Sequence, residues 1–116
     1  MLNWIDEFPA GITVIDALGI ILYMNCRAVE IFAEEGGKDL IGQNARECHP
    51  PREQKMMAAL LKSHRRHVFT MEENGKKVLI YQSPWYSRGE FSGFVELALE
   101  IPLILAIVPP VSKFFR

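Results

Sequence analysis

The chain has 116 residues, enough for one domain with a hydrophobic core. Hydrophobic residues make up 49% of it and charged residues 23%, which is the composition of a globular protein and excludes a largely disordered chain. The formal net charge of -1 argues against nucleic acid as a main partner, because phosphate binding requires a basic surface.

The cysteines and the start of the chain bear on its location. Cys26 and Cys48 form no disulfide framework and suit a reducing compartment. Residues 1–9 lack the basic start of a signal peptide. No stretch reaches the roughly 18 to 20 apolar residues that a transmembrane helix requires. We therefore expect a soluble, cytoplasmic protein without a membrane partner.

The first third of the chain predicts two strands and a helix. Residues 3–8 contain three large apolar side chains and favour a short helical cap. Residues 12–16 and 20–24 are apolar runs separated by the turn sequence Asp-Ala-Leu-Gly, which indicates a hairpin. Asn25 then suits the N-cap of a helix over residues 25–34, because its side-chain oxygen can accept from a free backbone amide in the first turn.

The middle of the chain predicts the longest helix. After one helical turn over residues 44–48, His49-Pro50-Pro51 cannot continue a helix, because proline lacks the backbone donor. Residues 52–66 then show helical periodicity. Four side chains at positions i, i+3, i+4 and i+7 share one stripe of this helix, namely Met57, Leu60, Leu61 and His64.

The last third of the chain predicts three strands, over residues 68–71, 78–86 and 91–101. Asn74-Gly75 favours a tight hairpin between the first two of them. The last strand alternates, with Val95, Leu97, Leu99 and Ile101 on one apolar face and Phe94, Glu96, Ala98 and Glu100 on a mixed face. Together with the first hairpin, these strands predict an α+β fold, with a five-stranded antiparallel sheet and helices packed on one face.

Two stretches of the sequence resemble one known family. Residues 16–32 resemble the opening of a PAS domain, and the family pattern is matched almost position by position through Asp16, Gly19, Tyr23, Asn25, Ala28 and Phe32. The element Cys48-His49-Pro50-Pro51 resembles one found in small bacterial and archaeal PAS modules that often accompany hemerythrin-like domains. Residues 38–42 resemble the family's hinge segment, in which Leu40 and Ile41 pack inward.

The resemblance implies an organisation and a function. It covers residues 10–101, preceded by an N-terminal cap segment over residues 1–9 and followed by a tail over residues 102–116. It implies a sensory or regulatory module in signal transduction. Such a module binds a small ligand between the helices and the sheet and relays the change through protein-protein contacts. The alternative is a ligand-free adaptor whose whole function is PAS-PAS pairing, and binding of a ligand by the purified protein distinguishes the two.

The expected ligand pocket lies between the helical layer and the sheet, as the resemblance implies. Its candidate lining is largely apolar, as binding pockets are, although the same side chains could fill a dry core. The candidates are Tyr23, Phe32, Leu40, Met57, Leu60, Leu61, Tyr81, Leu97 and Leu99. Haem is a candidate cofactor, because a histidine on the long helix ligates haem iron in some PAS sensors. His64 is the first candidate ligand and His49 the second, whereas the alternative for His64 is a neutral histidine with one hydrogen bond.

The resemblance also implies a homodimer or another PAS-PAS pair. PAS domains often pair through the outer sheet face and an N-terminal helix laid over it. The candidate interface residues are Trp4, Ile5, Phe8, Phe94 and Ala98, and the alternative is that cap and tail cover this face within one chain.

No residue pattern in the chain predicts catalysis or metal binding. A nucleophile elbow, a phosphate-cradling glycine loop and a helical pair of metal ligands are all missing from the sequence. The adjacent Cys48 and His49 do not match the spacing of a zinc site, so we expect Cys48 to be a small buried hydrophobe. We expect neither an enzyme nor a metal centre.

Overall fold

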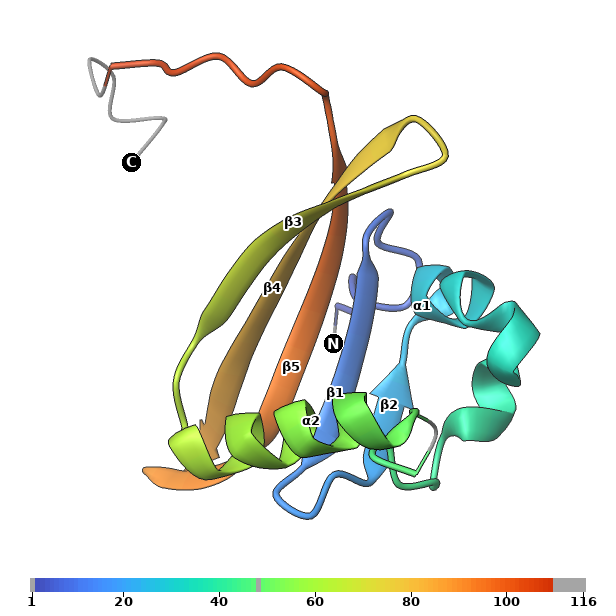
Figure 1. Cartoon of the computed structure of the whole chain (residues 1–116), viewed down its shortest axis with the longest axis vertical. Helices are drawn as coiled ribbons and strands as arrows, with labels where there is room; N and C mark the ends of the chain where they lie inside the picture. Colours follow the sequence, from blue (N-terminus) through green and yellow to red (C-terminus); the bar gives the residue numbers. More distant parts are fainter. Residues whose placement is uncertain (1, 48, 110–116) are drawn as a thin grey trace.

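The structure is a computed structural model that describes residues 2–47 and 49–109. The first hairpin forms as the sequence predicts (Figure 1). Its strands are β1 (Gly11–Asp16) and β2 (Ile21–Met24). In the turn, Oδ1 of Asp16 accepts from the backbone amides of Leu18 and Ile20, both at 2.9 Å. Gly19 completes the turn with a φ of 92°, a conformation that favours glycine.

The remaining elements complete a five-stranded antiparallel sheet in the spatial order β2-β1-β5-β4-β3. In chain order they are α1 (Cys26–Ile31), the 3-10 helices η1 (Ala33–Glu35) and η2 (Gly37–Leu40), α2 (Pro51–Ser63), β3 (His67–Glu73), β4 (Lys76–Ser87) and β5 (Glu90–Ile101). Figure 1 shows the helices on one side of the sheet, with α2 running across one end of the strands. The predicted α+β fold is confirmed.

Asn25 is the N-cap of α1, as predicted, and it also joins three segments of the chain. Its Oδ1 accepts from the backbone amides of Ala28 at 3.0 Å and Ile12 at 2.9 Å. Its Nδ2 donates to the carbonyls of Ala10 at 2.8 Å and Ile5 at 2.9 Å, with a longer contact to Phe8. The residue is 1% exposed, so one buried amide holds the N-terminal segment, β1 and α1 together.

Four local predictions differ from the structure. Residues 5–8 form one turn, closed by the amide of Phe8 and the carbonyl of Ile5 at 3.2 Å, and not a cap helix. The helix predicted to reach residue 34 ends at Ile31 and tightens into η1, and residues 44–47 form turns instead of a helix. Leu40 is buried as expected, but Ile41 is 42% exposed. The prediction for Cys48 lies outside the described residues.

Helix α2 is shorter than predicted and lightly packed. It starts at Pro51, where proline is favoured because the first helical amide needs no partner, and it ends at Ser63. His64 terminates it because that residue adopts a left-handed conformation with a φ of 53°. Only Leu61 among its residues is buried. No helix in the described part of the chain is both long and apolar enough to cross a membrane.

The described part of the tail, residues 102–109, has no regular structure and extends from the end of β5 (Figure 1). Its apolar side chains are exposed, Ile107 by 97%. Residues 110–116 lie outside the described chain.

Candidate functional site

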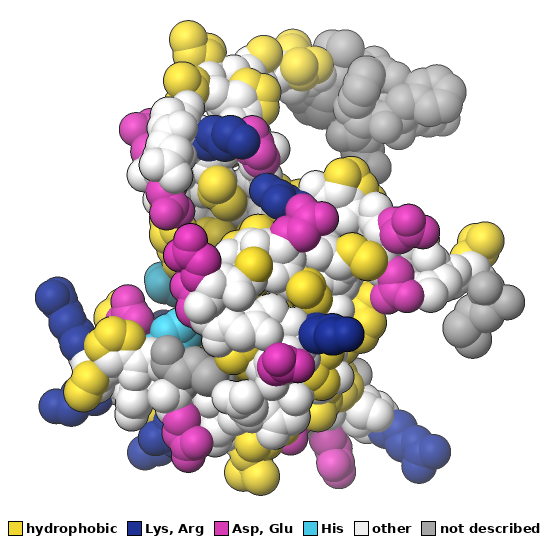
Figure 2. All heavy atoms as spheres, turned by 90° about the vertical axis from the view of Figure 1, so that its right-hand side faces the viewer, with side chains coloured by type: hydrophobic (Ala, Val, Ile, Leu, Met, Phe, Trp, Pro, Cys, Tyr) yellow, Lys and Arg dark blue, Asp and Glu magenta, His cyan; other side chains and the backbone are white. Residues whose placement is uncertain are grey.

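A cleft of about 1220 Å³ lies between the helices and the sheet. This volume exceeds that of a typical small-molecule pocket, so the cleft can accommodate a ligand of that class. Most of the surface of the lining is apolar, but many polar and charged side chains also line the cleft. The first helical layer contributes Phe32 and Leu40, and α2 with its approach contributes His49, Met56, Met57 and Leu60. The strands contribute Thr13, Ile15, Phe69, Ile80, Gln82, Phe94, Glu96 and Ala98. Figure 2, viewed from the side of α1, shows acidic and basic side chains interspersed over the outer surface of this layer.

The structure brings only part of the predicted pocket to this cleft. Four predicted apolar residues, Phe32, Leu40, Met57 and Leu60, line it. Five predicted lining residues are elsewhere, namely Tyr23, Leu61, Tyr81, Leu97 and Leu99. Leu61 is buried near the hairpin turn, where it faces Gly19. The other four belong to strands, and whether each of them lines the cleft depends on which face of the sheet its side chain occupies.

The predicted faces of β5 are reversed in the structure. Phe94 and Ala98, predicted at the dimer interface, line the cleft, and Phe94 is 3% exposed. Leu97 pairs with Tyr81 and Leu99 pairs with Leu79 in the β4–β5 register. Since successive side chains of a strand point to opposite faces, these pairs occupy the outer face. The more apolar face of β5 is therefore the outer one.

Only one of the two predicted haem-ligand histidines lines the cleft. His64 is exposed, and its ring stacks on Phe91 with the centroids 3.6 Å apart. Its left-handed backbone takes it off the helical stripe on which the prediction placed it. His49 does line the cleft, and its Nδ1 lies 3.3 Å from a carboxylate oxygen of Glu53.

A row of polar side chains crosses the sheet inside the cleft, and sequence reasoning missed it. His67, Gln82, Glu96 and Thr13 are register partners on the neighbouring strands β3, β4, β5 and β1, and all four line the cleft. Nε2 of Gln82 donates to Oε1 of Glu96 at 2.9 Å, and Oε1 of Gln82 lies 3.3 Å from Nδ1 of His67. The sequence signal that could have revealed this row was one polar residue among the apolar residues of each strand, at positions that pair across the sheet.

Tyr23 lies outside the cleft and ties β2 to the N-terminal segment. Its hydroxyl donates to a carboxylate oxygen of Asp6. Burial of the ring, then this hydrogen bond and the negative charge of Asp6, raise the pKa of Tyr23 to about 12. The same bond, with one from Asn3, lowers the pKa of Asp6.

This contact predicts a pH dependence. Because folding raises the pKa of Tyr23 above its ordinary 10.0, its contribution to stability is complete below pH 10 and is lost as the pH rises through about 12. An absorbance titration at a tyrosinate wavelength (about 295 nm) should therefore show a late step near pH 12, provided the fold persists. Tyr23→Phe should remove that step. Retention of the step in Tyr23→Phe would show that it belongs to another tyrosine.

Comparison with known proteins identifies the fold of residues 5–101, which match a family model described as the PAS fold. No curated protein matches the chain. Among solved structures, a C-terminal domain from Streptococcus mutans is 20% identical, with a TM-score of 0.70 over 83% of this chain and 78% of that one.

Two further structures show the same arrangement. The PAS domain of BvgS from Bordetella pertussis is 21% identical, with a TM-score of 0.65 over 84% of this chain and 81% of that one. The Aer2 receptor of Vibrio cholerae, a dual PAS-haem oxygen sensor, is 15% identical, with a TM-score of 0.64 over 80% of this chain and 95% of that one. The family match covers most of the chain, and the chain belongs to the PAS family.

Proposed function

We propose that this chain is a sensory module that binds a small ligand in the cleft between α2 and the sheet and passes the change to a protein partner. PAS domains are sensory and signalling modules and are generally not enzymes. The observation that carries the proposal is the apolar cleft of about 1220 Å³ beneath a helix with only one buried residue. A ligand there would contact both α2 and the sheet and so extend the core.

The helix supplies an adaptable wall for such a ligand. Met56, Met57 and Leu60 face the cleft from α2. Methionine is unbranched and flexible, so it adjusts to ligands of different shape. Binding changes signalling only if it favours one arrangement of α2 and the sheet over another. The lightly packed α2 is the element whose position a bound ligand would fix.

The outer face of the sheet is the surface through which we propose that the change reaches a partner protein. The cross-strand pairs Tyr81–Leu97 and Leu79–Leu99 give it an apolar surface on strands whose other face lines the cleft. The N-terminal segment adds an exposed aromatic side chain, Trp4, which is 59% exposed. Apolar surface of this kind is typical of a protein contact, and we propose a homodimer or another PAS partner here. The second candidate function, a ligand-free adaptor, rests on this same surface.

Haem is one ligand class that this proposal admits. His49 would hold its iron, because it lines the cleft and Glu53 lies 3.3 Å from its Nδ1, an arrangement that leaves Nε2 for the metal. Haem would supply gas or redox chemistry at that position. His64, which lies outside the cleft lining, is not proposed for this role.

The proposal predicts that filling the cleft from within abolishes binding. The probe is N-phenyl-1-naphthylamine, a neutral dye whose fluorescence rises in apolar surroundings. We expect the wild-type protein to bind it, and Ala98→Phe to weaken binding at least about tenfold, because the ring occupies the floor of the cleft. Met57→Trp blocks the same space from the opposite wall and serves as an independent second variant.

The matched control places the same ring on the outside. Thr70 pairs with Leu79 on the outer face and is exposed, so Thr70→Phe should bind the dye as the wild type does. Circular dichroism establishes that each variant folds. Equal dye binding by the wild type and both cleft variants would overturn the proposal, as would failure of the wild type to bind.

A further inference from the structure

We propose that the cleft selects ligands that carry a protonated amine on an apolar body, with Glu96 as the anchor of the amine. This inference rests on the proposed function, because it names the chemical class of the ligand that the cleft would take. Three observations carry it: the position of Glu96 on the floor, the direction of its hydrogen bond, and the charges around it.

Glu96 lies between two apolar rows of the cleft floor. On one side, Phe69, Ile80 and Ala98 are register partners across β3, β4 and β5. On the other side, Phe94 pairs with Ile15 across β5 and β1. All five of these apolar residues line the cleft. A ligand lying on this floor would rest its apolar body on the flanking rows and bring a polar group to Glu96.

The hydrogen bonds orient the row so that Glu96 still accepts. Gln82 turns its amide nitrogen to Oε1 of Glu96 and its amide oxygen to His67. Gln82 is the only side-chain donor to Glu96 among the described residues. A carboxylate has two oxygens and accepts several hydrogen bonds, so Oε2 is left for a donor from the ligand. Because Glu96 is half-buried, a hydrogen bond from such a donor contributes more to binding than the same bond does in open water.

The charges that line the cleft single out Glu96. Four other acidic residues of the lining are exposed, namely Glu35, Glu53, Glu73 and Glu100, whereas Glu96 is half-buried. The basic residues of the lining have other contacts or are exposed. Arg27 pairs with Glu30 at 3.0 Å, and Lys76 lies 3.9 Å from Glu100.

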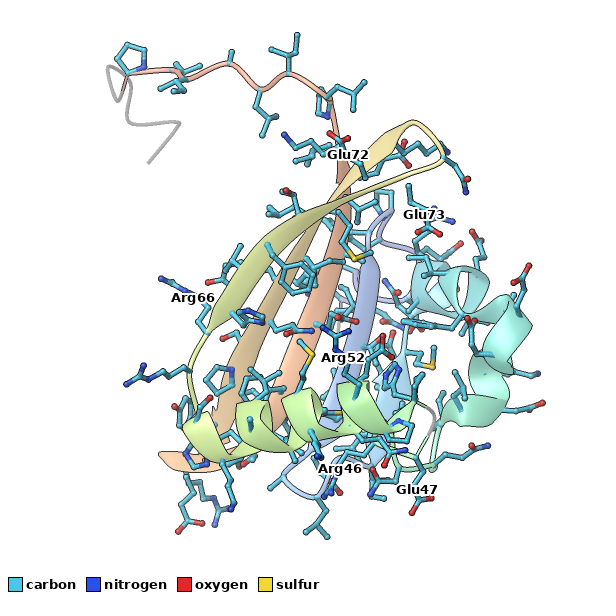
Figure 3. The ribbon with its side chains drawn as sticks, in the orientation of Figure 1. Arg46, Glu47, Arg52, Arg66, Glu72 and Glu73 are labelled. Atoms are coloured by element: carbon cyan, nitrogen blue, oxygen red, sulfur yellow. The ribbon has the colours of Figure 1, made fainter. Side chains whose placement is uncertain are left out.

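The remaining basic side chains of the lining are exposed. Arg65 is exposed in the connection between α2 and β3. Arg66 is exposed and donates to the Tyr81 hydroxyl at 3.3 Å, and Figure 3 shows its side chain pointing outward from the sheet. No described lysine or arginine forms an ion pair with Glu96. The carboxylate therefore favours a cationic group of the ligand and disfavours an anionic one.

The test uses three probes of one shape and different charge: 2-phenylethylamine, 2-phenylethanol and phenylacetate. Affinities are measured at pH 7 by titration calorimetry and by amide chemical shifts of the labelled protein. We expect the amine to bind about tenfold more tightly than the alcohol, and phenylacetate to bind most weakly. Glu96→Gln keeps the shape and should remove the preference. Glu72→Gln, an exposed position on β3 outside the cleft lining, should retain it.

The outcomes separate this inference from the function on which it rests. Equal affinity for the amine and the alcohol, or a preference that survives Glu96→Gln, would overturn the amine assignment. Binding of N-phenyl-1-naphthylamine without binding of the amine would overturn it as well, while leaving the ligand cleft in place. Failure of the dye and of all three probes would overturn both proposals.

Discussion

Replacing Asn25 with alanine is expected to lower the free energy of unfolding by about 3 to 5 kcal/mol. The substitution leaves the buried amides of Ile12 and Ala28 without their acceptor and the carbonyl of Ala10 without its donor. Each unsatisfied buried group costs about 1 to 3 kcal/mol, and the deleted amide also leaves a small cavity. Urea unfolding followed by circular dichroism measures the loss.

A matched asparagine separates burial from residue type. Asn3 is exposed and makes one side-chain hydrogen bond, to Asp6 at 2.7 Å, so Asn3→Ala should cost less than about 1 kcal/mol. Asn25→Asp keeps the acceptor but turns a carboxylate oxygen toward backbone carbonyls, and it should be as destabilising as Asn25→Ala at pH 7. If Asn25→Ala and Asn3→Ala cost the same, Asn25 does not hold the three segments together.

Gly93→Ala is the second substitution with a large expected effect, a loss of more than about 4 kcal/mol or no folded protein. A Cβ at this position would lie 1.9 Å from the carbonyl oxygen of Ile15, and the backbone has a φ of 144°. The same carbonyl accepts from Nε1 of Trp85 at 2.9 Å. Relief of the clash would require β1 to move away from β5, which would disrupt the floor of the cleft.

Gly75 provides the control for this substitution. It also has a positive φ, of 75°, but a Cβ there would meet no atom within 4 Å. Gly75→Ala should therefore cost only about 1 kcal/mol, the backbone penalty alone. Expression level, circular dichroism and thermal unfolding of the two variants provide the comparison. A Gly93→Ala protein as stable as Gly75→Ala would contradict the close approach of β1 to β5.

Local signals in the sequence were enough to predict the first hairpin and the start of α1. Asp16 and Gly19 act through hydrogen bonds and a backbone conformation within one turn, and Asn25 caps the helix that follows it directly. The wider role of Asn25 was not predictable from such signals. Its other partners, Ile5 and Ala10, are 20 and 15 residues away in the chain, and only the folded N-terminal segment brings them to it.

The faces of the sheet show where pattern reasoning failed. The alternation along β5 is present in the sequence, but it does not say which face the helices cover. The pattern predicts that the apolar face with Leu97 and Leu99 lies against the core, because apolar side chains usually lie inside. In this chain the helices cover the face with Glu96, over a cleft that admits polar groups. The outer face keeps the leucines, where the proposed protein contact would cover them.

The C-terminal end of α2 shows a second reason why the predicted cleft lining differs from the structure. His64 belonged to the helical stripe only if the helix continued through it. One left-handed residue at that point ends the helix and sends the side chain to Phe91. A stripe defined by spacing therefore loses its meaning at the first residue that leaves the helical conformation. Met57 and Leu60, further inside the helix, kept the predicted direction.

Native mass spectrometry, with an absorption spectrum of the same sample, tests the central claim most directly. The protein is purified under mild conditions as the wild type and as Ala98→Phe. We predict an additional mass on the wild-type protein that is released on denaturation and is missing from Ala98→Phe, and a Soret band would identify that mass as haem. A wild-type spectrum that contains only the chain or its whole-number multiples, from protein that also fails to bind N-phenyl-1-naphthylamine, would contradict the ligand sensor and leave the adaptor.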